Sequence, residues 1–367
     1  MNRALPKLMK AVVLKGHGGF DQLEYRLDVP IPVLRAGEVL VKIGAAGVNN
    51  TDINTRTAWY SRSVTDGTTA DAAALGYADA SAADSGWTGN SLRFPRIQGA
   101  DACGHIVGVA ADVDPARVGE RVLIEPVFAP PPGADRFRSI YFGSECDGGF
   151  AQYAAVPSAH ACRINSPLDD TELASFPCAY SAAENMLTRA NLRPRETVLI
   201  TGASGGVGSA AVQLARRRDA TVIAVAAASK SGDVTALGAA RVIGRDAGLV
   251  NDLGHESVDV VIDVVGGTQF PSLLDVLRRG GRCAVAGAIS GPTVQLDLRT
   301  LYLKDLRLLG CTVLEPDVFP NLVGYIERAE IRPLVAMRFP LSELVAAQRE
   351  FLAKRHIGKI VLQIPES

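Results

Sequence analysis

Residues 202–208 form the most chemically specific pattern in the sequence. The string Gly202-Ala203-Ser204-Gly205-Gly206-Val207-Gly208 follows an apolar strand-like run, Val198-Leu199-Ile200, and precedes a helix-like stretch over residues 209–218. Glycines let a backbone approach a ligand closely, and the amides at a helix N-terminus bind phosphate groups. A glycine-rich turn without a ligand is the alternative, but the strand, turn and helix context favours a dinucleotide site. The expected contacts are Gly202, Ser204, Gly205, Gly206, Val207 and Gly208.

The end of the next strand indicates which dinucleotide binds. NAD-binding proteins usually carry Asp or Glu about 20 residues beyond the turn, where it binds the ribose hydroxyls. Here the strand ends Val225-Ala226-Ala227-Ala228-Ser229-Lys230, without an acid. The Ser229 hydroxyl and the Lys230 ammonium suit a 2′-phosphate through charge-assisted hydrogen bonds, which predicts NADP(H) as the cofactor. In the alternative interpretation, Lys230 is an ordinary solvated residue of the following helical turn.

Two kinds of element must position these residues. Short strand-like runs bounded by Gly or Pro fill the first part, which favours a β-rich domain. From about residue 170, apolar strands alternate with helix-like stretches such as 209–218 and 271–279, which predicts a parallel, doubly wound α/β sheet. The predicted domains are 1–175, completed by 316–367, and 176–315. These boundaries place the glycine-rich turn in the second domain.

Composition excludes several classes of protein. The chain has 367 residues, 47% hydrophobic and 21% charged, and a formal net charge of -1. This near-neutral net charge gives no sign of the excess positive charge that binding to nucleic acid or to an anionic membrane requires. No run reaches the ~18 apolar residues of a membrane span, and the start does not read as a signal peptide. Six scattered cysteines suggest a reducing compartment, so we expect a cytoplasmic protein acting on a small molecule.

Residues 60–94 form an unusual segment. The stretch is rich in small and polar residues, and Tyr77 and Trp87 are its large apolar anchors. Connections longer than about 12–15 residues are uncommon and tend to be lids, binding loops or disordered segments. The hypothesis is an apolar lid that uses Trp59, Tyr60 and Trp87. A mobile insertion without a chemical role is the alternative.

Further segments form an ordered pattern along the chain, and together they resemble a known superfamily. They are Ala45-Ala46-Gly47-Val48-Asn49-Asn50-Thr51-Asp52, Gln98-Gly99-Ala100-Asp101, Gly119-Glu120-Arg121-Val122, Asp147-Gly148-Gly149-Phe150, Asp263-Val264-Val265-Gly266-Gly267 and Gly358-Lys359-Ile360-Val361-Leu362. With the glycine turn, they resemble the medium-chain dehydrogenase/reductases, specifically the quinone oxidoreductase-like branch of the zinc-type alcohol dehydrogenases. The resemblance implies a GroES-like catalytic domain interrupted by a Rossmann domain. It also implies a homodimer that uses an edge strand near Leu306–Gly310.

The resemblance also assigns site residues. It implies that Asn49, Asn50, Thr51 and Asp52 lie beside the nicotinamide, with Gln98 and Asp101 near the metal position of zinc-dependent members. Tyr180 is a candidate donor or pocket wall. Further candidate cofactor contacts are Val265, Gly266, Ala288 and Lys359.

The metal ligands of the zinc-dependent relatives are mostly replaced. Those relatives carry Cys where this chain has Asn49 and His where it has Ala100, while the third ligand position keeps a thiol at Cys178. Catalytic zinc needs three thiolate, imidazole or carboxylate ligands, so we expect no metal unless Asp101 substitutes after rearrangement. The structural zinc lobe is also missing, since its region near residues 130–146 has one Cys. The Gly254-His255-Glu256 tripeptide lies in the other domain and is not expected to bind metal.

Without a metal, hydrogen bonds must polarise the substrate. The hypothesis is hydride transfer from NADPH to a quinone, enone or other carbonyl, with Thr51 and an Asn amide steadying the oxyanion and water supplying the proton. Asn49 to Asp52 could instead simply cap a helix. The alternatives for the whole chain are a zinc-type alcohol dehydrogenase and a non-catalytic NADPH-binding protein. The latter is less favoured because no basic stripe interleaved with aromatics is present.

Overall fold

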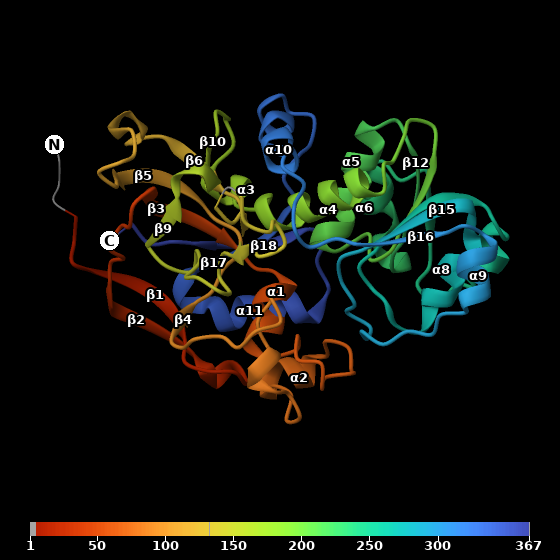
Figure 1. Cartoon of the computed structure of the whole chain (residues 1–367), viewed down its shortest axis with the longest axis horizontal. Coiled ribbons are helices and arrows are strands. Elements are labelled where there is room, and N and C mark those ends of the chain that lie inside the picture. The colour runs from red at the N-terminus through yellow and green to blue at the C-terminus, as the bar shows by residue number, and fades with distance from the viewer. Residues whose placement is uncertain (1–4, 132, 367) are drawn as a thin grey trace.

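Two sheet-based domains lie side by side in the computed structural model, which describes residues 5–131 and 133–366 (Figure 1). One is β-rich and draws strands from both ends of the chain, while the other is built on a parallel sheet from the middle. The predicted fold class is therefore confirmed.

The second domain is a six-stranded sheet in which every neighbouring pair is parallel. Its order, β13-β12-β11-β14-β15-β16, reverses direction beside β11, and ligands of open α/β sheets bind at such a switch point. The strands are β11 (Thr197–Ile200), β12 (Thr221–Val225), β13 (Arg241–Ile243), β14 (Val258–Asp263), β15 (Leu277–Val285) and β16 (Arg307–Gly310).

Helices cover both faces of this sheet because its strand residues are apolar on both sides. Val198 and Ile200 pack into the cluster that contains the α4 and α5 side chains, whereas Leu199 between them packs with α8 on the opposite face. The helices of this part are α4 (Pro177–Arg189), α5 (Gly206–Arg217), α6 (Ser231–Ala236), α7 (Leu249–Leu253), α8 (Phe270–Val276), α9 (Leu298–Leu303) and α10 (Val318–Glu327).

The β-rich domain is completed by the end of the chain. Strand β18 pairs with both β17 and β3, so the last residues bring Lys359 next to the segment that leads into α1. The strands are β1 (Leu8–Leu14), β2 (Leu23–Pro30), β3 (Glu38–Gly47), β4 (Arg96–Ile97), β5 (Cys103–Val109), β6 (Arg121–Ile124), β7 (Val127–Phe128), β8 (Ile140–Tyr141), β9 (Tyr153–Pro157), β10 (Ala161–Arg163), β17 (Val335–Pro340) and β18 (Lys359–Gln363). The helices are α1 (Asn50–Arg56), α2 (Ala70–Leu75), α3 (Asp170–Leu173) and α11 (Leu344–Ala353).

One predicted helix ends earlier than expected. The helix predicted over 271–279 stops at Val276, because Leu277 is extended, fully buried and paired with Val258 at the start of β15. The 60–94 segment contains the short helix α2, and β16 is the edge strand expected near Leu306–Gly310. Within the described ranges, no helix has the length and apolar character needed to cross a membrane.

Candidate active site

The glycine-rich turn joins the end of β11 to the start of α5. Gly202 has a left-handed φ of 58°, and Gly205 is the N-cap residue of α5. A Cβ at Gly208 would lie 2.2 Å from the Gly202 carbonyl oxygen, so only glycine allows the helix to approach the strand this closely. The first amides of α5 cannot pair within the helix. The turn therefore has the donors and the open backbone that a pyrophosphate needs.

Two neighbouring loops meet this turn at the same edge of the sheet. A Cβ added to Gly202 would lie 3.2 Å from a side-chain atom of Val265. A Cβ added to Gly266 would lie 3.2 Å from the Cβ of Ala288. The buried Asp263 carboxylate fixes the first loop by accepting the Val265 amide at 3.0 Å and that of Gly266. The structure thus brings together the predicted cofactor residues Gly202–Gly208, Val265, Gly266 and Ala288.

Lys230 lies nearby, but its ammonium already has partners. It donates hydrogen bonds of 2.7 Å and 2.6 Å to the carbonyls of Lys354 and His356, and the residue is 8% exposed. Ser229 is exposed one residue earlier. The structure adds a cation that the sequence analysis missed: Arg245 follows β13 and lies close enough to interact electrostatically with Lys230. A search for basic residues after the third strand, as well as the second, could have found it.

Four basic side chains therefore gather beside the turn: Lys230, Arg245, Lys354 and His356. Burial and the neighbouring Lys230 lower the pKa of Lys354 to about 7. Burial, Lys354 and Lys230 lower the pKa of His356 to about 4. The Lys354 ammonium donates to Asn50 Oδ1 at 3.1 Å, which connects this cluster to α1. Repulsion between neighbouring cations destabilises the folded protein unless an anion binds between them.

Asn49 and Asp52 hold the start of α1. Asn49 is the N-cap residue, and its backbone amide donates to Asp52 Oδ2 at 2.7 Å. Burial raises the pKa of the Asp52 carboxyl to about 7. Gln98 also contacts this helix, since its Nε2 donates a hydrogen bond to the Asp52 carbonyl at 2.8 Å. The capping role considered for this segment is thus present, and it accounts for Asn49, Asp52 and Gln98 structurally.

A buried ion pair lies where the sequence analysis places the metal of zinc-dependent relatives. The Lys359 ammonium is 2.7 Å from Asp101 Oδ2, and these side chains are 2% and 0% exposed. The same ammonium donates to the Val48 carbonyl at 2.9 Å and to Asn49 Oδ1. The Lys359 stem passes Gly206, where a Cβ would be 3.1 Å from its Cδ. Lys359 therefore connects the cofactor turn to the Asn49 and Asp101 cluster.

The other polar groups of the cluster are also occupied. Asn49 Nδ2 donates to Asp101 Oδ2 at 2.7 Å and to the Gly47 carbonyl at 3.3 Å, so the Asn49 amide has no spare hydrogen for a substrate. Asp101 Oδ1 accepts the backbone amide of Cys178 at 2.5 Å. Burial and the nearby Asp101 raise the pKa of the Cys178 thiol, which keeps it protonated.

These residues do not fit a zinc ion. Cysteine binds zinc as the thiolate, and the raised pKa of Cys178 disfavours that form. The Asp101 carboxylate is already paired with the Lys359 ammonium. Across residues 5–131 and 133–366, no three His, Cys, Asp or Glu side chains are grouped to hold a metal. His255 lies in an exposed turn between α7 and β14, in the parallel-sheet domain.

The Thr51 hydroxyl hydrogen has no acceptor among residues 5–131 and 133–366, so it is available to a ligand. Tyr60 donates its phenol hydrogen to Thr51 Oγ1 at 3.1 Å, so Thr51 acts as acceptor there. Burial raises the pKa of Tyr60, which keeps this donor protonated. Tyr60 stacks on Trp87, which in turn stacks on Tyr141 with ring centroids 4.5 Å apart. An aromatic wall thus stands directly beside Thr51.

The 60–94 segment spans both domains. The Thr68 amide donates to the carbonyl of Ile289 at 3.0 Å, next to Ala288 in the loop after β15. A Cβ at Gly67 would lie 2.5 Å from that carbonyl oxygen, which shows how closely the segment approaches the loop. The segment therefore bridges from the α1 region to the cofactor edge of the parallel sheet.

Tyr180 lies apart from this cluster in the hydrophobic core around α4. Its hydroxyl donates to the Arg332 carbonyl at 2.8 Å and accepts a hydrogen bond from Gln213 Nε2 at 2.8 Å. Tyr180 therefore packs and ties α4 to α5, and its donor is already used.

Comparisons with known proteins agree with this geometry. Residues 35–166 match the family described as alcohol dehydrogenase GroES-like domain, and residues 206–328 match the family described as zinc-binding dehydrogenase. A solved structure from Sinorhizobium meliloti 1021, provisionally named an alcohol dehydrogenase, is 45% identical, with a TM-score of 0.87 and 98% of each chain covered.

Two curated relatives span nearly the whole chain. Acryloyl-coenzyme A reductase of Metallosphaera sedula is 28% identical and covers 96% of this chain and 99% of its own. Quinone oxidoreductase of Lama guanicoe is 25% identical, with 97% and 98% covered.

Proposed function

The chain belongs to the medium-chain dehydrogenase/reductase superfamily of oxidoreductases, and from this premise we propose that it is an NADP(H)-dependent reductase of quinones, enones or related carbonyls that works without catalytic zinc. Nicotinamide cofactors are general in the superfamily. The observation that carries the rest is the buried ion pair of Lys359 and Asp101, which places an ammonium at the expected metal position.

The glycine turn and the basic cluster support the choice of cofactor. The first amides of α5, with Val265, Gly266 and Ala288 beside them, would hold the pyrophosphate and nicotinamide halves. Lys230, Arg245 and Lys354 would surround a 2′-phosphate, which would offset their mutual repulsion. When bound, the reduced cofactor supplies a hydride.

Thr51 would then stabilise negative charge on the substrate oxygen. Tyr60 supplies the hydrogen bond that the Thr51 hydroxyl accepts, and no described residue accepts the hydroxyl's own hydrogen. The Lys359 ammonium already uses its three hydrogens on Asp101, Val48 and Asn49, so it would hold the shape of the site without contacting the substrate. Of the two Asn amides considered for this role, that of Asn49 is unsuited, since both of its hydrogens are used. Water supplies the proton in this scheme.

The test of this function is a substrate panel that follows NADPH oxidation at 340 nm with quinones, enals and saturated aldehydes. We expect activity on quinones or enals. Thr51→Val should lower kcat by about 100-fold or more, the usual loss for one such donor, and Thr51→Ser should restore it. Activity on saturated aldehydes alone, or a stoichiometric metal in the purified protein, contradicts the proposal.

Arg245→Gln tests the cofactor choice. The exposed guanidinium should contribute one charged hydrogen bond to the 2′-phosphate, so Kd for NADPH should rise about tenfold while Kd for NADH stays constant. Equal changes for both cofactors would remove Arg245 from the site.

We further propose that residues 60–94 are a lid. The bridge from Thr68 to Ile289 and the stacked rings of Tyr60, Trp87 and Tyr141 support it. Deleting residues 62–90 should raise the KM for quinones without changing the affinity for NADPH. Unchanged quinone kinetics reject the lid.

A further inference from the structure

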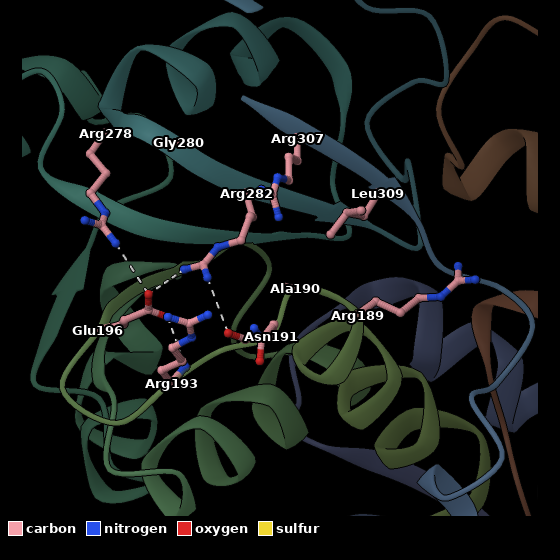
Figure 2. Close-up of a pocket in the computed structure, with 10 residues that line it drawn as sticks. All are labelled: Arg189, Ala190, Asn191, Arg193, Glu196, Arg278, Gly280, Arg282, Arg307 and Leu309. Carbon is pink, nitrogen blue, oxygen red and sulfur yellow. Dashed lines mark hydrogen bonds and ion pairs between the residues drawn. The ribbon is translucent and has the colours of Figure 1, made fainter. Parts of the chain in front are cut away.

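A second pocket lies at the opposite edge of the parallel sheet, beyond the starts of β11 and β16 and the end of α4 (Figure 2). The cofactor turn follows the carboxyl end of β11, whereas the pocket lies at the amino end of that strand. The length of the strands therefore separates the pocket from the cofactor turn. The pocket has a volume of about 280 Å³. Five of its lining residues are arginines, namely Arg189, Arg193, Arg278, Arg282 and Arg307, and the acid in its wall is Glu196.

The acids near this pocket do not neutralise it. Glu196 Oε1 accepts hydrogen bonds from Arg282 at 2.7 Å and from Arg278 at 3.4 Å. From outside the wall, Asp259 pairs with Arg278, and Glu315 pairs with Arg189. Three carboxylates therefore face the five guanidinium groups of the wall, and Glu315 is also shared with Arg136, which leaves at least two positive charges.

Arg193 and Arg307 carry that excess. Among the residues described, the guanidinium groups of both make no hydrogen bond or ion pair. The two come from different elements: Arg307 extends from β16, next to Arg282 on β15, and Arg193 extends from the loop below them (Figure 2). Unpaired cations on two sides of one pocket are the arrangement expected for an anion between them.

Arg282 gives independent evidence for a missing partner. The residue is 9% exposed, and its buried Nε has no acceptor in the described part of the chain. Arg282 and Arg307 are also register partners on neighbouring parallel strands, so their side chains leave the same face. Like charges directly opposite one another destabilise a sheet, and a buried unpaired donor adds a further cost. A bound anion would satisfy both.

We propose that this pocket binds a small phosphate-bearing anion, separately from the cofactor. Guanidinium groups match phosphate oxygens with paired, planar hydrogen bonds, which a pocket of lysines would not provide. Arg193 and Arg307 contact the phosphoryl groups from opposite sides, and Arg282 Nε donates from the wall. Both inorganic diphosphate and the diphosphate of a nucleotide carry this chemistry.

Calorimetric titration of the full chain with inorganic diphosphate tests the proposal. The double variant Arg193→Gln/Arg307→Gln removes the two unpaired guanidinium groups without breaking a described hydrogen bond, so it should fold normally. Its affinity for diphosphate should fall at least tenfold. Arg163→Gln, an exposed arginine on β10, is the matched control and should bind as the parent does. Arg245→Gln controls for binding at the cofactor turn and should also retain affinity.

The outcomes separate cleanly. No heat with the parent chain, unchanged affinity in the double variant, or an equal loss in Arg163→Gln overturns the proposal. A loss confined to Arg245→Gln places the anion at the cofactor turn and overturns it too. With the expected pattern, tighter binding of ADP than of diphosphate identifies a nucleotide as the source, and equal or weaker binding identifies the free inorganic anion.

Discussion

Lys359 and Asp101 illustrate how much one residue pair can change a site. Two full charges lie at 2% and 0% exposure, where each alone would be strongly disfavoured. Their pairing is completed by Val48, Asn49 and the Cys178 amide. Because those bonds use the polar atoms of the cluster, the pair leaves these atoms without lone pairs or charge to spare for a ligand, and it holds α1 against β18.

Removing the ammonium should therefore destabilise the protein strongly. Lys359→Met leaves Asp101 buried without its counter-charge, and the expected loss in the free energy of unfolding is about 3–5 kcal/mol. Urea denaturation measures it. The double variant Lys359→Met/Asp101→Asn removes both charges and should recover most of the loss. If the double variant is as unstable as the single one, the ion pair is not the cause.

Lys354 should make cofactor affinity depend on pH. Its pKa is lowered to about 7, so the free protein loses this charge as the pH rises through neutrality. A nearby phosphate favours the protonated form, which means that binding is strongest where Lys354 is charged. Fluorescence titrations should show NADPH affinity decreasing from pH 7 to pH 9, a range in which the 2′-phosphate is already ionised. Lys354→Met should flatten this profile, whereas an identical slope in the variant would exclude Lys354 as its origin.

At the scale of elements, the cofactor turn depends on how closely α5 approaches β11. Gly208→Ala would place a Cβ 2.2 Å from the Gly202 carbonyl oxygen, so helix and turn must separate. We expect cofactor binding to be lost, as measured by calorimetry with NADPH and with NADH. Gly232→Ala on α6 is the matched control, because its Cβ would meet no atom within 4 Å. That change should leave binding intact and stabilise the helix by up to about 1 kcal/mol. Normal binding in Gly208→Ala would contradict the close approach.

The elements also show what the sequence can and cannot predict. The strand, turn and helix around Gly202–Gly208 were predictable because local patterns specify them. The helix expected over 271–279 was shortened by a tertiary effect, the pairing of Leu277 with Val258. The partner of Lys359 was unpredictable for the same reason: Asp101 is 258 residues away in sequence and meets it only through the pairing of β18 with β3. Arg245 was missed because it lies beyond the strand that was searched.

At the scale of the whole molecule, the chain crosses between its domains more than once. Strands β17 and β18 return to the β-rich sheet, while α10 first packs against the α4 core through Phe319 and Leu322. The 60–94 segment makes a further bridge at Ile289. The proposed reductase site and lid both lie along these crossings, so the segment proposed to cover the substrate also connects the two domains.

We propose that the outer edge of β16 is the surface of a homodimer. This strand pairs with β15 alone among the described strands, and an unpaired edge is a template for another strand. Beside it, α9 exposes Leu298 at 63% and Tyr302 at 62%, and Leu308 on the edge itself is 38% exposed. Apolar side chains gathered on an open edge are typical of a surface that a second copy covers.

Leu308→Lys should therefore weaken the proposed dimer about tenfold or more, since it would place a charge in the centre of the edge that the second copy is proposed to cover. Sedimentation velocity across a range of protein concentrations measures the change. Leu27→Lys is the matched control, because Leu27 is a 63% exposed leucine on β2 in the other domain, and its dimer should equal that of the parent. A monomeric parent chain, or equal weakening by both variants, would show that the β16 edge is not the interface. The proposed chemistry would survive that result, because the residues around Lys359 and the glycine turn come from a single chain.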